Sequence, residues 1–392
     1  MIRRVAFVCF LAASVLAPTH GRAVDEPIQL HVITSLTGLG AFLGKQDLVS
    51  IQIGEKLLNK GGGIQGRPVK FNFYDDQSNP QVAVQLTKQV IATKPSVILG
   101  AHIVAMCNAM APLVRNGPVQ YCFSPAIHPA PGSYTFSSTV ATQDAVRAQL
   151  RYFRAKGITR LALLASTDAS GEDGERILDE ELKLPENKDF NLLDRAHFNT
   201  SDVSVSAQLE RLKAAQPQAF FAWTVGTPLG TVFKGLIQAG INSPIVISYG
   251  NQTYAQMEQY ADFTPKQLYV PSSAWPPHPE RLSLAPAVEA VQKNFYAAFK
   301  AAGLTPDVGA TASWDPMMIV VDALRKLGPD ATAEQLHDYL SHLKGYAGIN
   351  GIYDFEKVPQ RGLSDENAVV TLWNAGTKTW DVVSKPGGTP LD

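Results

Sequence analysis

Short apolar runs with the composition of β-strands alternate with helical patterns along almost the whole chain, and this alternation limits the fold more than any other feature. Residues 28–35 and 69–74 have the character of strands, and apolar residues recur at helical spacing in the 44–60 segment between them. Further strands are expected at 97–99, 119–123, 161–165, 219–224 and 245–248, and further helices at 107–115, 142–156, 171–182, 203–215 and 228–239. Short buried strands joined by helices of ~10–15 residues indicate parallel sheets with right-handed crossovers. The sequence therefore predicts an α/β fold.

The strand–helix series is too long for one sheet, so we expect two lobes. Residues 130–142 are rich in Gly, Ser, Thr and Pro and divide the series. Two more irregular stretches, 271–279 and 345–351, precede further helices at 284–302 and 310–327 and strands at 352–355 and 368–374. Three crossings between lobes form a hinge, and hinge closure around a ligand is a known motion. We predict a first lobe of residues 24–139 plus 274–349 and a second lobe of residues 140–273 plus 350–392.

The first 23 residues have the pattern of a secretory signal peptide. Arg3 and Arg4 form a basic start, residues 5–16 are an apolar run, and small residues precede a cleavage site expected after Ala23. Cys9 lies inside the apolar run without a cleavage consensus for lipid attachment. We therefore expect a soluble protein exported to the periplasm. The formal charge of −1 gives no sign of a nucleic-acid partner.

The loop at 37–45 resembles two phosphate-binding patterns and satisfies neither. Leu39 and Gln46 replace residues that a P-loop requires, and Leu43 replaces the third glycine of the dinucleotide fingerprint. The chain has no Gly-x-Ser-x-Gly and no His-Glu-x-x-His sequence, which are local signatures of hydrolases. We expect no catalytic activity, no cofactor and no metal, and we interpret the 37–45 loop as a turn of small residues.

The cysteines of the exported chain, Cys107 and Cys122, are separated by 15 residues. An oxidising compartment favours a disulfide between them, and the alternative is a pair of buried thiols. His102 and His128 flank the pair, but their spacing matches no standard zinc pattern. His128 follows a buried strand, where parallel sheets present their ligand crevice, so it is either a carboxylate ligand or a solvent-facing loop residue. Trp275 lies among prolines and either packs in the hinge or covers an apolar ligand.

Two neighbouring segments carry a specific signature. They read Leu58-Asn-Lys-Gly-Gly-Gly-Ile-Gln-Gly-Arg-Pro-Val69 and Tyr74-Asp-Asp-Gln-Ser-Asn-Pro80, and Ser78 is expected to cap the helix that follows. With Thr34-Ser-Leu-Thr-Gly38, the residues around Gly100 and Ser124, and Gly348-Ile-Asn-Gly-Ile-Tyr-Asp-Phe355, they resemble the leucine/branched-chain amino-acid-binding family of periplasmic solute receptors. That resemblance covers essentially the whole exported chain. It implies a type I periplasmic binding fold of two Rossmann-like lobes, three hinge crossovers, a ligand held between the lobes, no catalysis, and the permease subunits of an ABC importer as partners of a monomer.

The resemblance also assigns ligand contacts, residue by residue. In the first lobe these are His102, Val104, Ala105, Ala126 and His128, and in the second lobe Ser170, Thr224, Val225, Gly226, Tyr249 and, from a crossover, Trp275. Phe42 is added as a ring that could pack on the ligand.

The chain departs from the family where the family binds an amino acid. Val104 and His128 replace hydroxyl residues that hold the α-carboxylate, and Tyr249 replaces a carboxylate that faces the α-ammonium. A buried ammonium without an anionic partner is costly. We therefore expect a hydrophobic or aromatic carboxylate without an amine, with His128 and main-chain N–H groups on the acid and Trp275, Phe42 and Tyr249 around the body. The alternatives are a neutral or branched-chain amino acid, or a role as the sensing subunit of a signalling system.

Overall fold

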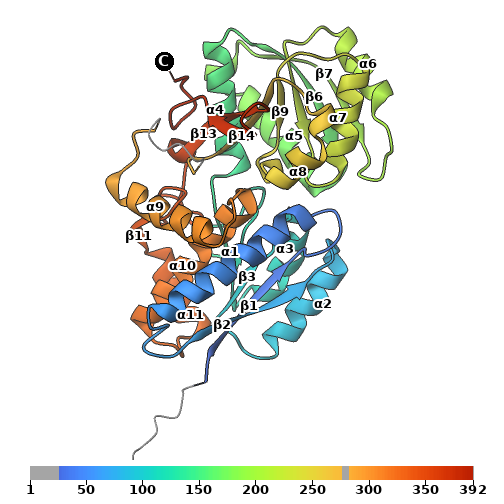
Figure 1. The fold of residues 1–392 in the computed structure, drawn as a ribbon. Coiled ribbons are helices and arrows are strands. Elements are labelled where there is room, and N and C mark those ends of the chain that lie inside the picture. Colours follow the sequence, from blue (N-terminus) through green and yellow to red (C-terminus); the bar gives the residue numbers. More distant parts are fainter. Residues whose placement is uncertain (1–25, 276–281, 392) are drawn as a thin grey trace, which may run out of the picture.

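The computed structural model describes residues 26–275 and 282–391, so the predicted signal peptide and part of the second irregular stretch lie outside the described residues. Figure 1 shows two α/β lobes, one above the other, and the first described strand and helix lie in the lower lobe. Within the described ranges, no helix combines the length and the apolar character that a membrane span needs. The predicted α/β class and the two-lobed periplasmic binding fold are confirmed.

The lower lobe is built on a sheet of five strands in the order β2-β1-β3-β4-β5, and all neighbours run parallel. Parallel neighbours need long crossovers, which explains the helix between successive strands. Helices α10 and α11 return to this lobe from the C-terminal third of the chain (Figure 1). Its strands are β1 (Ile28–Thr34), β2 (Val69–Asp75), β3 (Val97–Gly100), β4 (Val119–Cys122) and β5 (Thr135–Ser137), and its helices are α1 (Ala41–Lys60), α2 (Pro80–Ile91), α3 (Val104–Met110), α9 (Pro286–Ala301), α10 (Val308–Leu327) and α11 (Ala333–Ser341).

The upper lobe is built on a seven-stranded sheet in the order β14-β13-β10-β9-β8-β6-β7, in which β13 and β14 are antiparallel additions to a parallel sheet. Its strands are β6 (Arg160–Ser166), β7 (Asn191–Phe198), β8 (Ala219–Trp223), β9 (Ile245–Ile247), β10 (Leu268–Ser273), β13 (Ala368–Asn374) and β14 (Thr379–Val382), and its helices are α4 (Thr142–Ala155), α5 (Ala169–Leu182), α6 (Ser206–Ala214), α7 (Pro228–Gln238) and α8 (Tyr254–Gln259). A separate hairpin pairs β11 (Lys344–Ala347) with β12 (Ile352–Asp354).

Three segments connect the lobes, between β5 and α4, between β10 and α9, and between β12 and β13. Hydrogen bonds join them side by side: the Val140 N–H donates to Ser273 Oγ at 3.2 Å, and the Ser137 N–H donates to the Gln360 carbonyl at 2.8 Å. Arg361, only 5% exposed, donates to the carbonyls of Pro125, Ile127, Ser138 and Thr139. Buried backbone carbonyls need donors, so this arginine binds the third crossover to the first. The residues at which the lobes divide, 139, 273 and 349, stay predictions.

Several local expectations need correction. Asn79, and not Ser78, caps α2, because its side chain accepts the N–H groups of Gln81 and Val82. The second irregular stretch begins at residue 274, three residues later than expected, because residues 271–273 form the end of β10 and pair with β13. The expected disulfide, by contrast, is confirmed: it joins Cys107 on α3 to Cys122 on β4. Among the described residues, no three His, Cys, Asp or Glu side chains are grouped to hold a metal ion.

Candidate functional site

A small closed cavity lies between the two lobes, at the carboxyl ends of β3, β4, β8 and β9. In open α/β sheets this edge is where ligands bind. The cavity has a volume of about 30 Å³, and its walls come from both lobes. The predicted site residues that line it are His102, Val104, Ala126, Ser170, Val225 and Tyr249. The sequence analysis did not predict the other lining residues, which are Leu43, Ile103, Ser124, Pro125, Thr142, Ala145, Trp223, Ser248 and Gly250.

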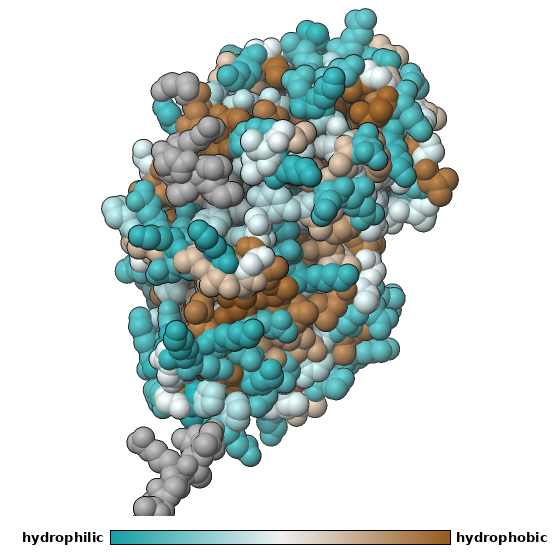
Figure 2. All heavy atoms as spheres, in the orientation of Figure 1, coloured by the Kyte–Doolittle hydropathy of each residue, from teal (hydrophilic) through white to brown (hydrophobic). Residues whose placement is uncertain are grey.

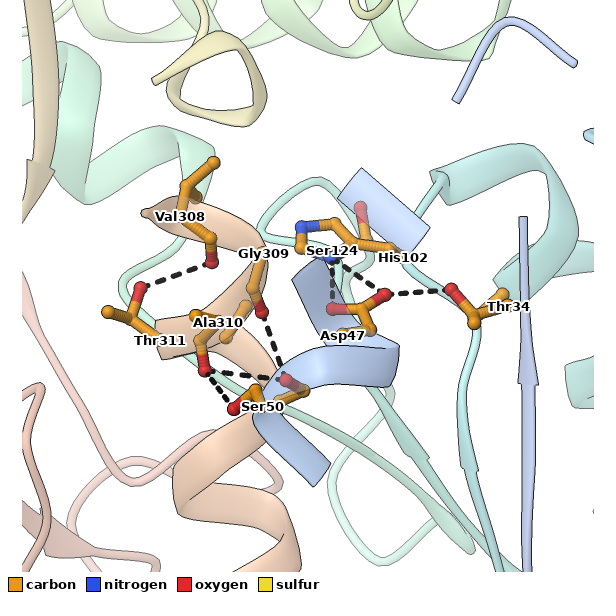
Figure 3. A network of polar contacts seen from close by, with 12 residues as sticks. Thr34, Asp47, Ser50, His102, Ser124, Val308, Gly309, Ala310 and Thr311 are labelled. Carbon is orange, nitrogen blue, oxygen red and sulfur yellow. Dashed lines mark hydrogen bonds and ion pairs between the residues drawn. The ribbon is translucent and has the colours of Figure 1, made fainter. Parts of the chain in front are cut away.

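His102 is the lining residue with the most unusual environment. It follows β3 and is 2% exposed. Its Nδ1 lies 3.1 Å from Asp47 Oδ1 of α1, and Asp47 Oδ2 accepts the Thr34 hydroxyl at 2.7 Å. Figure 3 shows the other ring nitrogen turned away from Asp47. That atom, Nε2, is buried and has no hydrogen-bond partner in the described part of the chain.

The cavity wall carries almost no charge. Among the described residues, His102 is the only lining side chain of an ionisable acid or base other than Tyr249. Asp47 stands behind His102 and is fully buried. An unpartnered polar atom in such a place is costly to leave unsatisfied, so His102 Nε2 marks the point at which a ligand's polar group can be received.

The upper lobe contributes a mostly apolar wall with a few hydroxyl groups. Trp223 ends β8, and Ser248, Tyr249 and Gly250 follow β9. The Tyr249 hydroxyl accepts the indole N–H of Trp275 at 3.0 Å. Burial raises the pKa of Tyr249 to about 12, so this side chain stays a neutral phenol. Ser170, at the start of α5, donates its hydroxyl to Asp168 at 2.9 Å.

His128 lies outside this cavity. Its Nε2 is 2.7 Å from Asp173 Oδ1 on α5, and Arg176 binds the same carboxylate oxygen at 2.6 Å. The His128 side chain is 38% exposed, whereas Asp173 is 7% exposed. His128, which we expected to hold the carboxylate of a ligand, thus contacts a carboxylate of the protein across the two lobes in this structure.

The other predicted residues that the structure keeps away from the cavity support its walls or the contact between lobes. Trp275 is buried behind Tyr249, with its carbonyl bonded to the Tyr296 hydroxyl. The Phe42 ring meets Tyr260 of the upper lobe edge-on at 6.4 Å. The cavity is also not lined by Thr224, Gly226 or Ala105. Ala105 packs against a buried hydrophobic cluster that includes Met106 and Met110 of α3.

Gly226 lies where the backbones of the two lobes approach each other. The neighbouring Thr227 N–H donates to the Leu39 carbonyl at 3.2 Å. A Cβ atom on Gly226 would lie 2.3 Å from that carbonyl oxygen. Asn251 holds the Gly226 loop from behind by accepting the Gly226 N–H at 3.0 Å and donating to the Thr224 carbonyl at 2.6 Å. The structure is thus closed, with the two lobes in direct contact, and Figure 2 shows no open channel between them on the face drawn.

Comparisons with known proteins agree on the fold. A family model described as periplasmic binding protein matches residues 27–377. An extracellular ligand-binding receptor from Rhodopseudomonas palustris HaA2 superposes with a TM-score of 0.80 at 17% identity, covering 92% of this chain and 100% of that one. No curated protein matches the sequence.

Two further solved structures carry ligands. A solute-binding protein of an R. palustris ABC transporter, in complex with benzoate, superposes with a TM-score of 0.74 at 17% identity and covers 93% of this chain and 97% of its own. The branched-chain amino acid transporter protein LivJ of Streptococcus pneumoniae, in complex with isoleucine, has the same TM-score and identity and covers 91% and 99%. At such identities the likeness concerns the fold alone.

Proposed function

Because the chain belongs to the periplasmic binding protein family, we propose that it is a receptor that closes on a small hydrophobic or aromatic carboxylate and delivers it to an ABC importer. Proteins of this family are solute receptors rather than enzymes. The proposal includes export through the signal peptide at 1–23, lobes of residues 24–139 plus 274–349 and 140–273 plus 350–392, the importer's permease subunits as partners, and a monomeric state without a cofactor.

One observation carries the choice of ligand: a largely apolar cavity contains a buried, unpartnered nitrogen, His102 Nε2, and no carboxylate of the described residues lines it. A protonated imidazole nitrogen donates well to a carboxylate. An α-ammonium would find no anionic partner there, and burying it unpaired is costly. An acid group on an apolar body therefore fits this wall better than an amino acid does.

The volume of the cavity indicates that binding involves the hinge. About 30 Å³ is room for about one or two water molecules, whereas ligand pockets usually have ~300–1,000 Å³. Entry of a ring-sized ligand requires the contacts between the lobes, such as that of Gly226 with Leu39, to open. The three crossovers, joined by hydrogen bonds, are the part of the chain about which such a motion can occur.

A second candidate ligand is a branched-chain amino acid, because one similar structure contains isoleucine. The structure that contains benzoate favours the aromatic carboxylate in the same way. A thermal-shift and calorimetry screen decides between them, using benzoate, phenylacetate, leucine and isoleucine. Benzamide is the matched control, because it has benzoate's shape without its charge.

We expect benzoate or phenylacetate to raise the melting temperature and the three neutral ligands to have little effect. A ligand at 100 times its Kd stabilises the folded state by about 2.7 kcal/mol. The proposal is wrong if leucine or isoleucine stabilises the protein while the aromatic acids do not. Native mass spectrometry of freshly purified protein adds an independent check, since a retained ligand is identified by its mass.

A further inference from the structure

Arg361 places a buried positive charge directly behind the lower-lobe wall of the cavity. It lies in the third crossover and is 5% exposed. Its guanidinium donates to the carbonyl of Ile127 at 2.5 Å and to the carbonyl of Pro125 at 3.3 Å. Pro125 lines the cavity, and its carbonyl also accepts the N–H of Thr142, another lining residue, at 3.2 Å. A single carbonyl group therefore separates the guanidinium from the lining.

The charge of Arg361 has no direct counter-charge. Among the described residues no carboxylate forms an ion pair with it, and its hydrogen bonds go to four carbonyl groups. Arginine stays protonated in proteins. Two acids of the upper lobe act on it from a longer range, Asp144 on α4 and Asp173 on α5. Because Asp173 is already bound by Arg176 and His128, and burial raises the pKa of Asp144, these acids offset the charge only in part.

The peptide group between Pro125 and Ala126 carries the effect of this charge toward the cavity. The peptide is trans, so its C=O and its N–H point in opposite directions. Since the carbonyl faces Arg361, the Ala126 N–H points away from it and donates to Ser124 Oγ at 3.3 Å. Ser124 and Ala126 both line the cavity. A cation bound to the carbonyl polarises the peptide group and makes its N–H a stronger donor.

The described part of the wall offers no other fixed positive charge. No lysine or arginine of the described residues lines the cavity. The phenols of Tyr121 and Tyr353 also act on Arg361, but burial raises the pKa of each, so both are neutral. Charges interact more strongly in a protein interior than in water, because the interior screens them less. Arg361 therefore favours an anion in the cavity and disfavours a cation, without touching either.

We propose that Arg361 is a positioning residue for the ligand's acid group: it fixes the 124–127 loop through its carbonyls and gives the lower-lobe wall the positive potential that selects a carboxylate over an ammonium. The inference deepens the proposed function and rests on it for the ligand. A lysine at this position would keep the charge with fewer hydrogen bonds, whereas a glutamine would keep hydrogen bonds without the charge. These two variants separate the electrostatic role from a merely structural one.

The first test needs no ligand. Ala126→Cys places a thiol on the wall, and because Cys107 and Cys122 are joined in a disulfide, its pKa can be measured from the rate of alkylation against pH. Adding Arg361→Gln should raise the pKa of this thiol by about one unit, which is a tenfold smaller thiolate fraction near neutral pH. Adding Arg361→Lys should leave it nearly unchanged. Equal thiol pKa values in the three backgrounds overturn the inference.

A comparison between the two walls serves if Arg361→Gln does not fold. Ser248→Cys places a thiol on the upper-lobe wall, where Ser248 donates to the Thr224 carbonyl at 3.0 Å. With Arg361 in place, the thiol of Ala126→Cys should have the lower pKa of the two. The reverse order overturns the inference.

The second test measures the affinity for benzoate and phenylacetate by calorimetry. Arg361→Gln should weaken binding by about ten- to a hundredfold, and Arg361→Lys by only a few fold. Arg151→Gln is the control, because it removes a partly exposed arginine that is paired with Asp365, and it should bind like the wild type. Equal losses for Arg361→Gln and Arg361→Lys would show a structural role only and overturn the inference. If neither acid binds the wild type, the proposed ligand fails, and the thiol measurement still decides whether Arg361 gives the wall its potential.

Discussion

At the scale of single residues, the sequence analysis predicted both His102 and His128 as ligand contacts, and the structure places them in different surroundings. Both follow buried strands of the lower sheet, so their position along the chain could not separate them. Their partners do: Asp47 is 55 residues before His102, and Asp173 is 45 residues after His128. No local pattern predicts such pairs, because they depend on how α1 packs on β3 and on how the lobes close. The residues that line the cavity from α4, Thr142 and Ala145, gave no sequence signal for the same reason.

A prediction at this scale concerns Asp307, the first residue before α10. It is fully buried, one oxygen accepts the Gly309 N–H at 3.1 Å, and the other oxygen has no partner among the described residues. Burial raises the pKa of Asp307 from 3.8 to about 8. Between these values the unfolded chain releases the proton and the folded chain keeps it, so stability decreases as pH rises from about 4 to about 8, by at most ~1.4 kcal/mol per pH unit.

Asp307→Asn removes this dependence and keeps the oxygen that caps Gly309. We expect the variant to have a free energy of unfolding within about 1 kcal/mol of the wild type at pH 4 and to exceed it by about 2 kcal/mol or more at pH 8. Denaturant unfolding at the two pH values measures the difference. Asp315→Asn is a comparison in which burial also raises the pKa of the carboxyl. Asp315 accepts hydrogen bonds from Ile349, Asn350 and Tyr353, so its replacement should destabilise the protein at pH 4, where Asp307→Asn should not. Equal stability differences for Asp307→Asn at both pH values would contradict the prediction.

At the scale of elements, apolar runs in the sequence predicted the central strands of both sheets but missed most of the strands at the sheet edges. β3, β4 and β8 are buried at every residue and were predicted from composition alone. β7 lies at the end of the upper sheet and exposes or half-exposes most of its residues, so it carries charged side chains and no apolar run. β10 was not predicted, because Pro271 and the serines after it suggest a loop, although they pair with β13. The order of the central elements was therefore predictable. Of the edge strands, β2 was predicted, whereas β5, β7 and β14 were not.

The loop after β8 gives a prediction about closure. Gly226 has φ +86° and faces the Leu39 carbonyl, so Gly226→Ala adds backbone strain and also a contact of 2.3 Å across the cleft. Gly66→Ala is the matched control, because Gly66 has φ +89° and no atom within 4 Å of the added Cβ. Both variants should lose about 1 kcal/mol or more of stability from the positive φ.

Only Gly226→Ala should keep the lobes from closing fully. We expect a larger radius of gyration in small-angle scattering and at least a tenfold weaker affinity for the ligand found in the screen, with Gly66→Ala close to the wild type in both. If the two alanine variants scatter and bind alike, the contact of Gly226 with Leu39 does not limit closure.

At the scale of the whole molecule, the two-lobed arrangement was predictable because the signature segments occur in the order of the family, and the family is confirmed by a match over residues 27–377. How far the two lobes close on each other could not be predicted from the sequence. It depends on contacts between residues far apart in the sequence, such as Thr227 with Leu39 and Val308 with Gln252, each a single backbone hydrogen bond. Each of these hydrogen bonds is weak by itself, so we expect single side chains to shift the free-energy difference between the open and closed states.

The hydrogen bond of His128 with Asp173 is a contact between the lobes that one substitution removes. Because its histidine is partly exposed, we expect it to contribute about 0.5–1 kcal/mol to closure, so His128→Ala should lower the ratio of closed to open molecules about two- to fivefold. His197→Ala is the control: His197 pairs with Glu175 at the same 2.7 Å and similar exposure, but both residues belong to the upper lobe. Fluorescence energy transfer between labels on the two lobes reports the ratio without ligand. An equal shift for His197→Ala, or none for His128→Ala at low salt, would show that the pair does not hold the lobes closed.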